Sequence, residues 1–415
     1  MLCVSTLMPY PPVGGGESKF FHLLREASRF HEVDLLLFPP AEPRREDIEG
    51  LRPHARSIRI EPYKPRAGIR DKLRSLISPY PFSIVAYREP SEASYAPGTP
   101  SYAPGKSPVR GAVKRALSLD RYDLLHVEGC FLGGAIVGLR TPPRLILPHD
   151  AIYRNYMENL KLAPWRRKPT LALDLLKFRR LEPRLYGYYD AVGMCTTVEA
   201  RAVKKLNPAL HVGVVSNGAD PCTSAPDPQV EEFPSLVFSG SFDYPPNELA
   251  ALRLMGRIAP PLRRRWPKLT VFIVGNRPTR RMERAAARNP GNIITGRVES
   301  VPEWLARGSV YCSPLSYGVG FKNKVPEAWA AARPLVATPK TMEGIEFIPG
   351  RDALVAETDA DLVRACAMLL DDADRRRKIG ESGRKRIDER YNWPLLAKDL
   401  LELYDYVAAK PANTR

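Results

Sequence analysis

The N-terminal part of the chain has apolar positions spaced for a strand, a helix and a second strand. An apolar opening segment is followed by a proline- and glycine-rich stretch over 9–17. Phe20, Phe21 and Leu24 then recur at helical spacing, and residues 32–38 form a second apolar run. A strand, glycine loop, helix and strand of this length form a βαβ unit, which implies a parallel sheet.

The same alternation of apolar runs and helix-like stretches continues along the chain. A proline-rich, acidic stretch at 224–235 is predicted to be a linker between domains 1–223 and 236–392. We expect an α/β protein of two tandem Rossmann-like domains, whose parallel sheets face across a cleft. The last segment, 393–415, is predicted to form a helix that crosses back to the first domain. The further strands are expected at 57–60, 124–127, 144–147, 191–195, 236–239, 269–274, 293–295, 310–314 and 335–337.

One segment interrupts this pattern. Residues 81–108 are dense in proline, glycine and serine, and the sequence SYAPG occurs twice, at 94–98 and 101–105. This composition predicts a mobile surface loop, which could overhang the acceptor side of a cleft.

Composition favours a globular protein of the cytoplasm. Of the 415 residues, 44% are apolar and 26% are charged, and no apolar run reaches the roughly 18 residues of a membrane-spanning helix. The N-terminus has no basic region before its apolar segment, so it is predicted to be a strand rather than an export signal. The six cysteines are scattered singly, which predicts buried free thiols, with no metal site and no disulfide framework.

The net charge of +17 allows several partners. A basic surface suits nucleic acid, an anionic membrane or phosphorylated ligands, and genome bias gives the same composition. The basic clusters at 165–168 and 177–180 are interpreted either as solvated helix faces or as a surface for a membrane or an acceptor. No recognisable nucleic-acid module is present, so we expect no nucleic-acid partner.

Candidate chemistry in the first domain lies after its strands, because ligands of open parallel sheets bind at the carboxyl ends of the strands. Glycines 14–16 would let an anion approach the backbone at a helix N-terminus, and the alternative is a tight turn without a ligand. His149 and Asp150 follow another strand. They could bind sugar hydroxyls or move protons, although a single histidine is often structural.

In the second domain, residues 318–328 combine glycines with Lys322 and Lys324 before a helix. Backbone amides and ammonium groups there would stabilise a diphosphate leaving group. Glu327 in the first helical turn could accept hydrogen bonds from ribose hydroxyls, or it could only cap the helix.

Taken in order, these segments resemble the group-1 retaining glycosyltransferases (glycosyltransferase family 4) over nearly the whole chain. The stretch at 318–339 is the most specific, and the Asn-Gly-x-Asp signal at 217–220 comes next. The segments that carry the resemblance are PPVGGGE at 11–17, HEV at 31–33, YDLLHVE at 122–128, PHD at 148–150, VVSNGAD at 214–220, FSGSFDYPPNELA at 238–250, GVGFKNKVPEAWAAARPLVATP at 318–339, MEGIE at 342–346 and YNW at 391–393.

The resemblance implies a GT-B fold, with the acceptor domain first, and transfer with retention of configuration without a metal ion or other cofactor. It implies that His149, Lys322, Lys324 and Glu327 take part in catalysis, with His149 on the transferred sugar and Glu327 on the ribose. The implied acceptor-side residues are Glu17 and Asp150. The implied donor-binding residues are Gly15, Gly16, Gly240, Ser241, Asn247, Gly318, Gly320, Phe321, Glu343, Gly344 and Ile345.

Two departures from the family pattern concern the donor site. Val319 stands where many members have the first of two glutamates. Ser241 and Asn247 stand where many have an arginine and a lysine that clamp the diphosphate. We hypothesise that Lys322 and Lys324 replace that clamp.

The predicted function is transfer of a sugar from a nucleotide diphosphate sugar to an acceptor hydroxyl. The acceptor would be a saccharide, a lipid-linked glycan or a small natural product, and the basic first domain could bring the protein to the inner face of a membrane. The alternatives are a nucleotide-sugar epimerase or hydrolase of the same fold, and a non-catalytic protein that binds sugar nucleotides.

Overall fold

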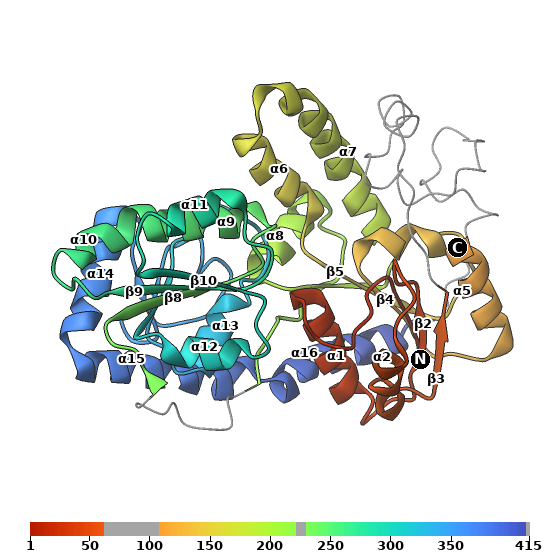
Figure 1. Cartoon of the computed structure of the whole chain (residues 1–415). Helices are drawn as coiled ribbons and strands as arrows, with labels where there is room; N and C mark the ends of the chain where they lie inside the picture. The colour runs from red at the N-terminus through yellow and green to blue at the C-terminus, as the bar shows by residue number, and fades with distance from the viewer. Residues whose placement is uncertain (62–107, 221–229, 412–415) are drawn as a thin grey trace. The chain divides into compact units, whose positions relative to one another are not determined.

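The computed structural model describes residues 1–61, 108–220 and 230–411 (Figure 1). The chain forms two compact units. Unit 1 comprises Met1–Asn217 and Trp393–Arg415, and unit 2 comprises Gly218–Asn392. The predicted boundary at residue 223 and most of the predicted loop over 81–108 lie outside the described residues.

Unit 1 is built on one sheet of seven parallel strands in the order β3-β2-β1-β4-β5-β6-β7. The order reverses between β1 and β4, and this is the point at which open α/β sheets bind ligands. The strands are β1 (Leu2–Ser5), β2 (Asp34–Leu37), β3 (Ser57–Ile60), β4 (Leu125–Glu128), β5 (Arg144–His149), β6 (Ala191–Met194) and β7 (Val212–Val214).

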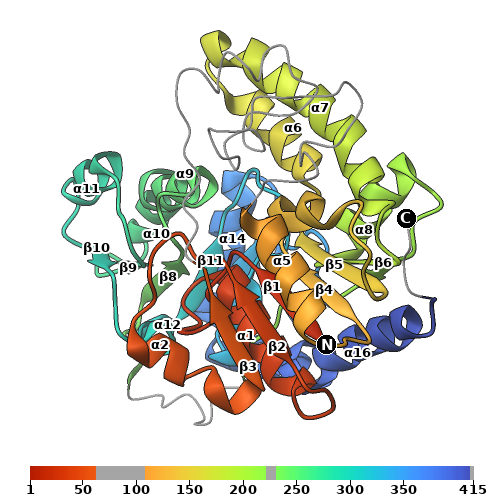
Figure 2. The same cartoon turned by 90° about the vertical axis from the view of Figure 1, so that its right-hand side faces the viewer.

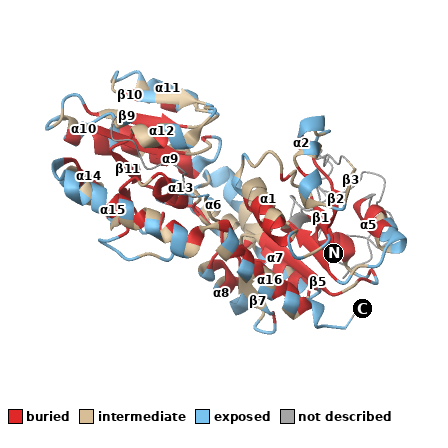
Figure 3. Cartoon of the chain, turned by 90° about the horizontal axis from the view of Figure 1, so that it is seen from below, coloured by how far each residue is buried: buried red, intermediate tan, exposed pale blue. Residues whose placement is uncertain are grey.

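Helices cover both faces of this sheet (Figure 3). Helices α1 and α16 pack together on one face of the sheet. Helices α5 and η2 pack together on the other face. Most strand residues are therefore buried on both sides, which explains why their sequences are continuously apolar instead of alternating. Within the described residues, the helices of unit 1 are α1 (Gly15–Ala27), α2 (Arg45–Glu49), η1 (Arg52–His54), α5 (Pro108–Leu119), η2 (Cys130–Ile136), α6 (Ile152–Leu162), η3 (Trp165–Arg167), α7 (Lys168–Tyr186), α8 (Thr197–Leu206) and α16 (Trp393–Ala408).

Unit 2 repeats the plan with six parallel strands in the order β10-β9-β8-β11-β12-β13. Here the order reverses between β8 and β11. The strands are β8 (Ser235–Ser239), β9 (Thr270–Val274), β10 (Asn292–Gly296), β11 (Val310–Ser313), β12 (Leu335–Ala337) and β13 (Leu354–Val355).

In unit 2 the helices again form two layers. Helices α9, α10, α11 and α14 lie on one side of the sheet, and α12, α13 and α15 lie on the other (Figure 1). The helices are α9 (Pro245–Arg253), η5 (Leu254–Ile258), α10 (Ala259–Arg263), α11 (Arg280–Ala286), α12 (Val301–Arg307), α13 (Lys324–Ala330), α14 (Asp359–Asp371), α15 (Ala373–Arg386) and η6 (Ile387–Tyr391).

The predicted fold class is confirmed: each unit is a Rossmann-like α/β layer structure with a parallel sheet. The predicted C-terminal helix exists as α16 and belongs to unit 1, where it packs on β5, β6 and β7. No helix among the described residues is long and apolar enough to cross a membrane.

Candidate functional site

The loops that follow β8 and β11 meet at the point where the strand order of unit 2 reverses. Asn247 closes the first loop, because its side-chain amide donates to the carbonyl of Ser241 over 2.9 Å. A Cβ atom at Gly240 would lie 2.8 Å from the Asn247 amide nitrogen, so only glycine lets that side chain fold so close. This hydrogen bond leaves the carboxamide oxygen of Asn247 directed at the segment that follows β11.

Lys324 begins α13, directly after the loop that follows β11, and contacts Asn247. Its ammonium nitrogen lies 3.0 Å from Oδ1 of Asn247 and 5.6 Å from the centre of the Phe238 ring. Burial lowers the pKa of Lys324 to about 8, although the nearby Glu327 carboxylate favours the charged form. A positive charge therefore stands beside the position at which the family pattern places its lysine.

Glu327 lies one helical turn after Lys324, and its carboxylate is 3.5 Å from the hydroxyl of Ser239 at the end of β8. The same hydroxyl lies 2.8 Å from that of Tyr311, which is buried. Desolvation by the surrounding protein raises the pKa of Glu327, and yet its side chain is exposed to solvent. Because accessibility decides whether a ligand can reach a group, Glu327 is able to accept hydrogen bonds from one.

The segment before α13 has a backbone that requires glycine. Gly318 and Gly320 have φ angles of 121° and 75°, in the region that side chains disfavour. Lys322 is buried and donates to the carbonyl of Gly320 over 2.5 Å, so its ammonium is directed at its own loop. Phe321 packs near Tyr391, with ring centroids 5.9 Å apart. Of the two lysines, Lys324 is therefore the one placed beside the clamp position.

Ser241 is engaged within its own unit. Its hydroxyl lies 2.5 Å from Oδ1 of Asp243 and 2.6 Å from Oδ1 of Asn276. Asn276 precedes Arg277, which has a φ of 53° and pairs with Asp243. The serine hence fixes the loop conformation and does not supply the missing positive charge.

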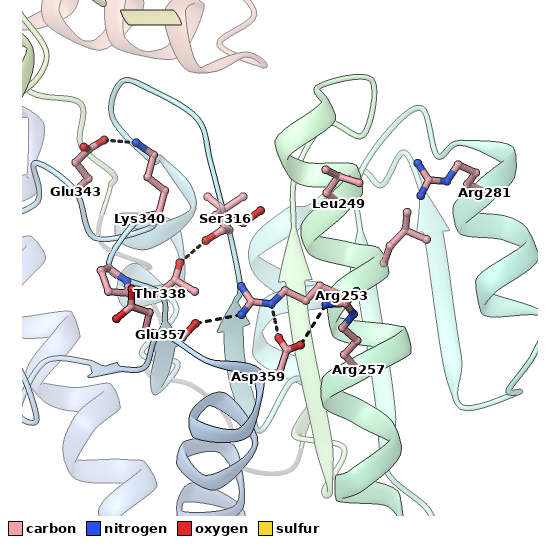
Figure 4. Close-up of a pocket in the computed structure, with 13 residues that line it drawn as sticks. Leu249, Arg253, Arg257, Arg281, Ser316, Thr338, Lys340, Glu343, Glu357 and Asp359 are labelled. Atoms are coloured by element: carbon pink, nitrogen blue, oxygen red, sulfur yellow. Dashed lines mark hydrogen bonds and ion pairs between the residues drawn. The ribbon is translucent and has the colours of Figure 1, made fainter. Parts of the chain in front are cut away.

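The loop after β12 carries the three remaining predicted residues of unit 2. Gly344 has a φ of 77°, Ile345 is buried, and Glu343 pairs with Lys340 over 2.9 Å. Glu343 also lines a cavity of about 860 Å³ between α9, α14 and the loops after β11 and β12 (Figure 4). Apart from Glu343, none of the predicted catalytic or donor-binding residues lines that cavity.

The cations around this cavity are balanced by carboxylates (Figure 4). Arg253 of α9 contacts Asp359 at the start of α14 over 2.5 Å, and Arg257 lies 3.5 Å from the same carboxylate. Arg253 also donates to the carbonyl of Pro314. These contacts join two helices to a loop, which is a structural role.

In unit 1, the predicted residues lie at the carboxyl ends of β1 and β5. Gly15 and Gly16 start α1, whose first amides have no acceptor inside the helix. Glu17 follows them and lines a hollow of about 370 Å³ with Tyr10 and several prolines. Of the residues singled out from the sequence, Gly14 and Glu17 line this hollow, whereas Gly15 and Gly16 do not.

His149 ends β5 with a φ of 69°, which is unusual for a residue other than glycine. Its side chain is 20% exposed, and its Nε2 lies 2.9 Å from Oε1 of Glu128 at the end of β4. Asp150 accepts a hydrogen bond from the thiol of Cys195. The histidine thus reaches solvent from a buried polar cluster.

Sequence reasoning missed the residues beneath His149. His126 and Glu128 lie in a mainly apolar segment that predicts only a strand. Tyr404 is separated from His126 by 278 positions in the sequence. Lys19 is fully buried and donates to the carbonyl of Val215 over 2.6 Å. One signal was available in the sequence: Glu128 stands at the carboxyl end of a strand, where open parallel sheets bind their ligands.

Comparison with known proteins agrees with this arrangement. Residues 233–372 match the family model described as "Glycosyl transferases group 1". A phosphatidyl-myo-inositol mannosyltransferase of Mycobacterium tuberculosis is 23% identical over 214 residues, which cover 48% of this chain and 56% of that protein. An MMP alpha-(1->4)-mannosyltransferase of Mycolicibacterium hassiacum is 30% identical over 119 residues, which cover 28% of each. The match thus spans about half the length of the first of these relatives.

Solved structures resemble the chain over nearly its whole length. Sucrose-phosphate synthase from Thermosynechococcus elongatus aligns with a TM-score of 0.69 at 18% identity, covering 97% of this chain and 98% of that one. HepE of Anabaena, in complex with UDP and glucose, aligns with a TM-score of 0.63 at 15% identity, covering 97% and 99%. Such identities show a shared fold. Residues 233–372 of unit 2 thus match the group-1 glycosyltransferases, and the two parallel-sheet units have the GT-B fold of the solved glycosyltransferase structures.

Proposed function

We propose that this protein transfers a sugar from a nucleotide diphosphate sugar to an acceptor hydroxyl, with retention of configuration and without a metal ion. The observation that carries the proposal is the contact of Lys324 with Asn247 at the point where the strand order of unit 2 reverses. Lys324 is a partly buried residue, and its ammonium group would bind the diphosphate, which is the group that must leave.

In the proposed reaction, the bond between the sugar C1 and the diphosphate oxygen breaks, and the acceptor oxygen bonds to C1 on the face that the diphosphate leaves. The acceptor proton passes to the departing phosphate. Lys324 stabilises the negative charge that grows on this group, Glu327 holds the ribose, and His149 contacts the sugar. Lys322 braces the loop through Gly320.

The names of the relatives support the donor class. Two are called mannosyltransferases, and HepE is recorded with UDP and glucose. The charge count also fits: the cation absent from position 247 is present at Lys324, so the site keeps a charge for the diphosphate.

A donor screen tests this proposal. We expect one family of nucleotides among UDP, GDP, dTDP and ADP to raise the melting temperature, because a ligand that binds only the folded state stabilises it. With the matching nucleotide sugar and a set of acceptors, product should form equally with and without EDTA. Donor consumption without an acceptor would favour an epimerase or hydrolase, and binding without turnover would favour a non-catalytic protein.

We also propose that unit 1 contacts an anionic membrane surface through the hairpin of α6 and α7. The two helices lie side by side and project from the sheet (Figure 2). At the tip, Trp165 is 75% exposed, Leu162 is 52% exposed, and residues 166–168 are exposed cations. Tryptophan at the interface and cations near lipid phosphates are typical of proteins that lie on a membrane. The relative named for phosphatidyl-myo-inositol has a lipid in its name, which supports a lipid-linked acceptor here.

Replacing Arg166, Arg167 and Lys168 together by alanine is expected to weaken co-sedimentation with vesicles of phosphatidylglycerol and phosphatidylcholine about 100-fold. The reason is that each cation near an anionic surface contributes about 1 kcal/mol. A matched control removes the three exposed cations Arg375, Arg377 and Lys378 of α15, which changes the net charge equally. Equal losses in both variants would show that only overall charge matters, and the hairpin proposal would then fail.

A further inference from the structure

Four side chains form a continuous buried series beneath the candidate sugar-binding histidine of unit 1. The hydroxyl of Tyr404 lies 2.8 Å from Nδ1 of His126, and Nε2 of His126 lies 2.9 Å from Oε2 of Glu128. The other carboxylate oxygen, Oε1, lies 2.9 Å from Nε2 of His149. Tyr404, His126 and Glu128 are buried, and only His149 reaches solvent.

The charges within this series are fixed by burial and mutual contact. Burial alone would raise the pKa of Glu128, but the two histidines hold it well below its usual range. Burial alone would lower the pKa of His126, but the Cys3 thiol and the Glu128 carboxylate raise it to about 10. Contact with Glu128 thus favours the charged form of His126, and contact with the two histidines favours the charged form of Glu128.

Glu128 therefore has a second partner besides His149. Because His126 contacts one carboxylate oxygen and is itself contacted by Tyr404, the other oxygen faces Nε2 of His149 from a fixed position.

The backbone also fixes the position of His149. Its φ of 69° is held by the β-sheet, since the amide of Cys195 donates to the His149 carbonyl over 3.1 Å. Such unusual backbone conformations persist where the surroundings enforce them, and they occur often at functional sites. The Nε2–Oε1 contact has the distance of an ion pair but not the alignment of a hydrogen bond. Contacts of this kind often tighten only when substrate binds.

We propose that Glu128 is a positioning residue, which holds the Nε2 hydrogen of His149 so that the Nδ1 lone pair is presented to a hydroxyl of the transferred sugar. His126 and Tyr404 hold Glu128 in turn, so helix α16 contributes to the site although it touches no ligand. The inference rests on the proposed function for the sugar, but the state of the His149 ring can be measured without any reaction.

The test is a long-range ¹H–¹⁵N NMR experiment on the full chain labelled at its six histidines, without donor. The signals of His149 and His126 are assigned with His149→Gln and His126→Gln variants. We expect wild-type His149 to be in the Nε2–H form. In Glu128→Gln we expect a mixture with the Nδ1–H form, together with a kcat about 10- to 100-fold lower and a KM for the donor within about threefold of the wild type, because positioning acts mainly on the transition state.

The matched control is Glu182→Gln. Glu182 is another buried carboxylate of unit 1, which accepts from the amides of Ile152 and Tyr153 and does not belong to the series. An unchanged His149 tautomer in Glu128→Gln, with kcat equal to that of the control, would overturn the inference. If Glu128→Gln does not fold, the wild type still decides, since an Nδ1–H tautomer at His149 contradicts the inference. If no donor is ever turned over, the proposed function fails, while the NMR result still judges the role of Glu128.

Discussion

Replacing Lys324 by alanine is expected to lower kcat by about 100- to 1,000-fold, because removing one preorganised donor from a developing anion costs about that much. The affinity for free nucleotide should fall far less, since the charge on the leaving diphosphate grows mainly in the transition state. Steady-state kinetics with the preferred donor and calorimetry with the free nucleotide measure the two effects. Equal losses in kcat and in affinity would mean that Lys324 only binds.

Two further variants make this prediction specific to charge. Lys324→Arg keeps a cation and should retain much more activity than Lys324→Ala. Adding Asn247→Lys to Lys324→Ala returns a cation to the family's position, next to the place where the Lys324 ammonium lies 3.0 Å from Asn247. That double variant should regain at least part of the lost kcat. Failure of both rescues would argue for a purely structural role of Lys324.

The pH dependence follows from the same group. The ammonium of Lys324 is protonated below its pKa of about 8 and neutral above it. We therefore expect kcat/KM of the wild type to be highest below pH 8 and to fall as the pH rises through that value. In Lys324→Arg the fall should be absent, because arginine stays charged over the whole range. A fall that persists in the arginine variant would assign the basic limb to another group.

Replacing Glu327 by alanine should act on donor binding rather than on the chemical step. The side chain is exposed beside Ser239, and hydrogen bonds from ribose hydroxyls to a carboxylate contribute about 1.5–3 kcal/mol. We expect the Kd of the free nucleotide to rise about 10- to 100-fold, as measured by calorimetry. The Kd of the corresponding base alone should not change.

Glu303 offers the control for the simpler role of a helix-capping carboxylate. It stands in the first turn of α12, as Glu327 stands in the first turn of α13. Removing either should lower the free energy of unfolding by no more than about 1 kcal/mol, through the helix dipole. Only Glu327→Ala should weaken nucleotide binding. Similar nucleotide affinities in the two variants would leave Glu327 with the capping role alone.

The sequence was sufficient to predict both sheets, because their strands are apolar on both faces and helices of clear period separate them. The two short strands β7 and β13 were missed. In β7, Gly213 interrupts the apolar pattern, and this glycine is needed because a Cβ atom there would lie 2.8 Å from Leu403 of α16. In β13, two residues are too few to show any period. Both cases depend on contacts between distant segments, which no local pattern contains.

The candidate site was predictable only where its residues lie close together in the sequence. Glycines 318 and 320 and Lys324 stand close together in sequence, so their shared chemistry was visible. The contact of Lys324 with Asn247 joins residues 77 positions apart, and the series from Tyr404 to His149 joins β4, β5 and α16. Sequence spacing says nothing about such distances. The predicted roles of all these residues stay predictions until they are measured.

The return of α16 to unit 1 has a consequence for synthesis on the ribosome. The apolar surface of β5 and β6, including Leu145, Leu147 and Ala191, is covered by Leu396, Leu400 and Leu403 of that helix. All of unit 2 is translated before α16 emerges, which takes about 10 to 40 s at typical rates. During that time the nascent first unit carries an open apolar face, while unit 2, continuous in sequence, can fold as a whole. Chaperone contacts on nascent chains should therefore concentrate on unit 1 and end when α16 leaves the exit tunnel.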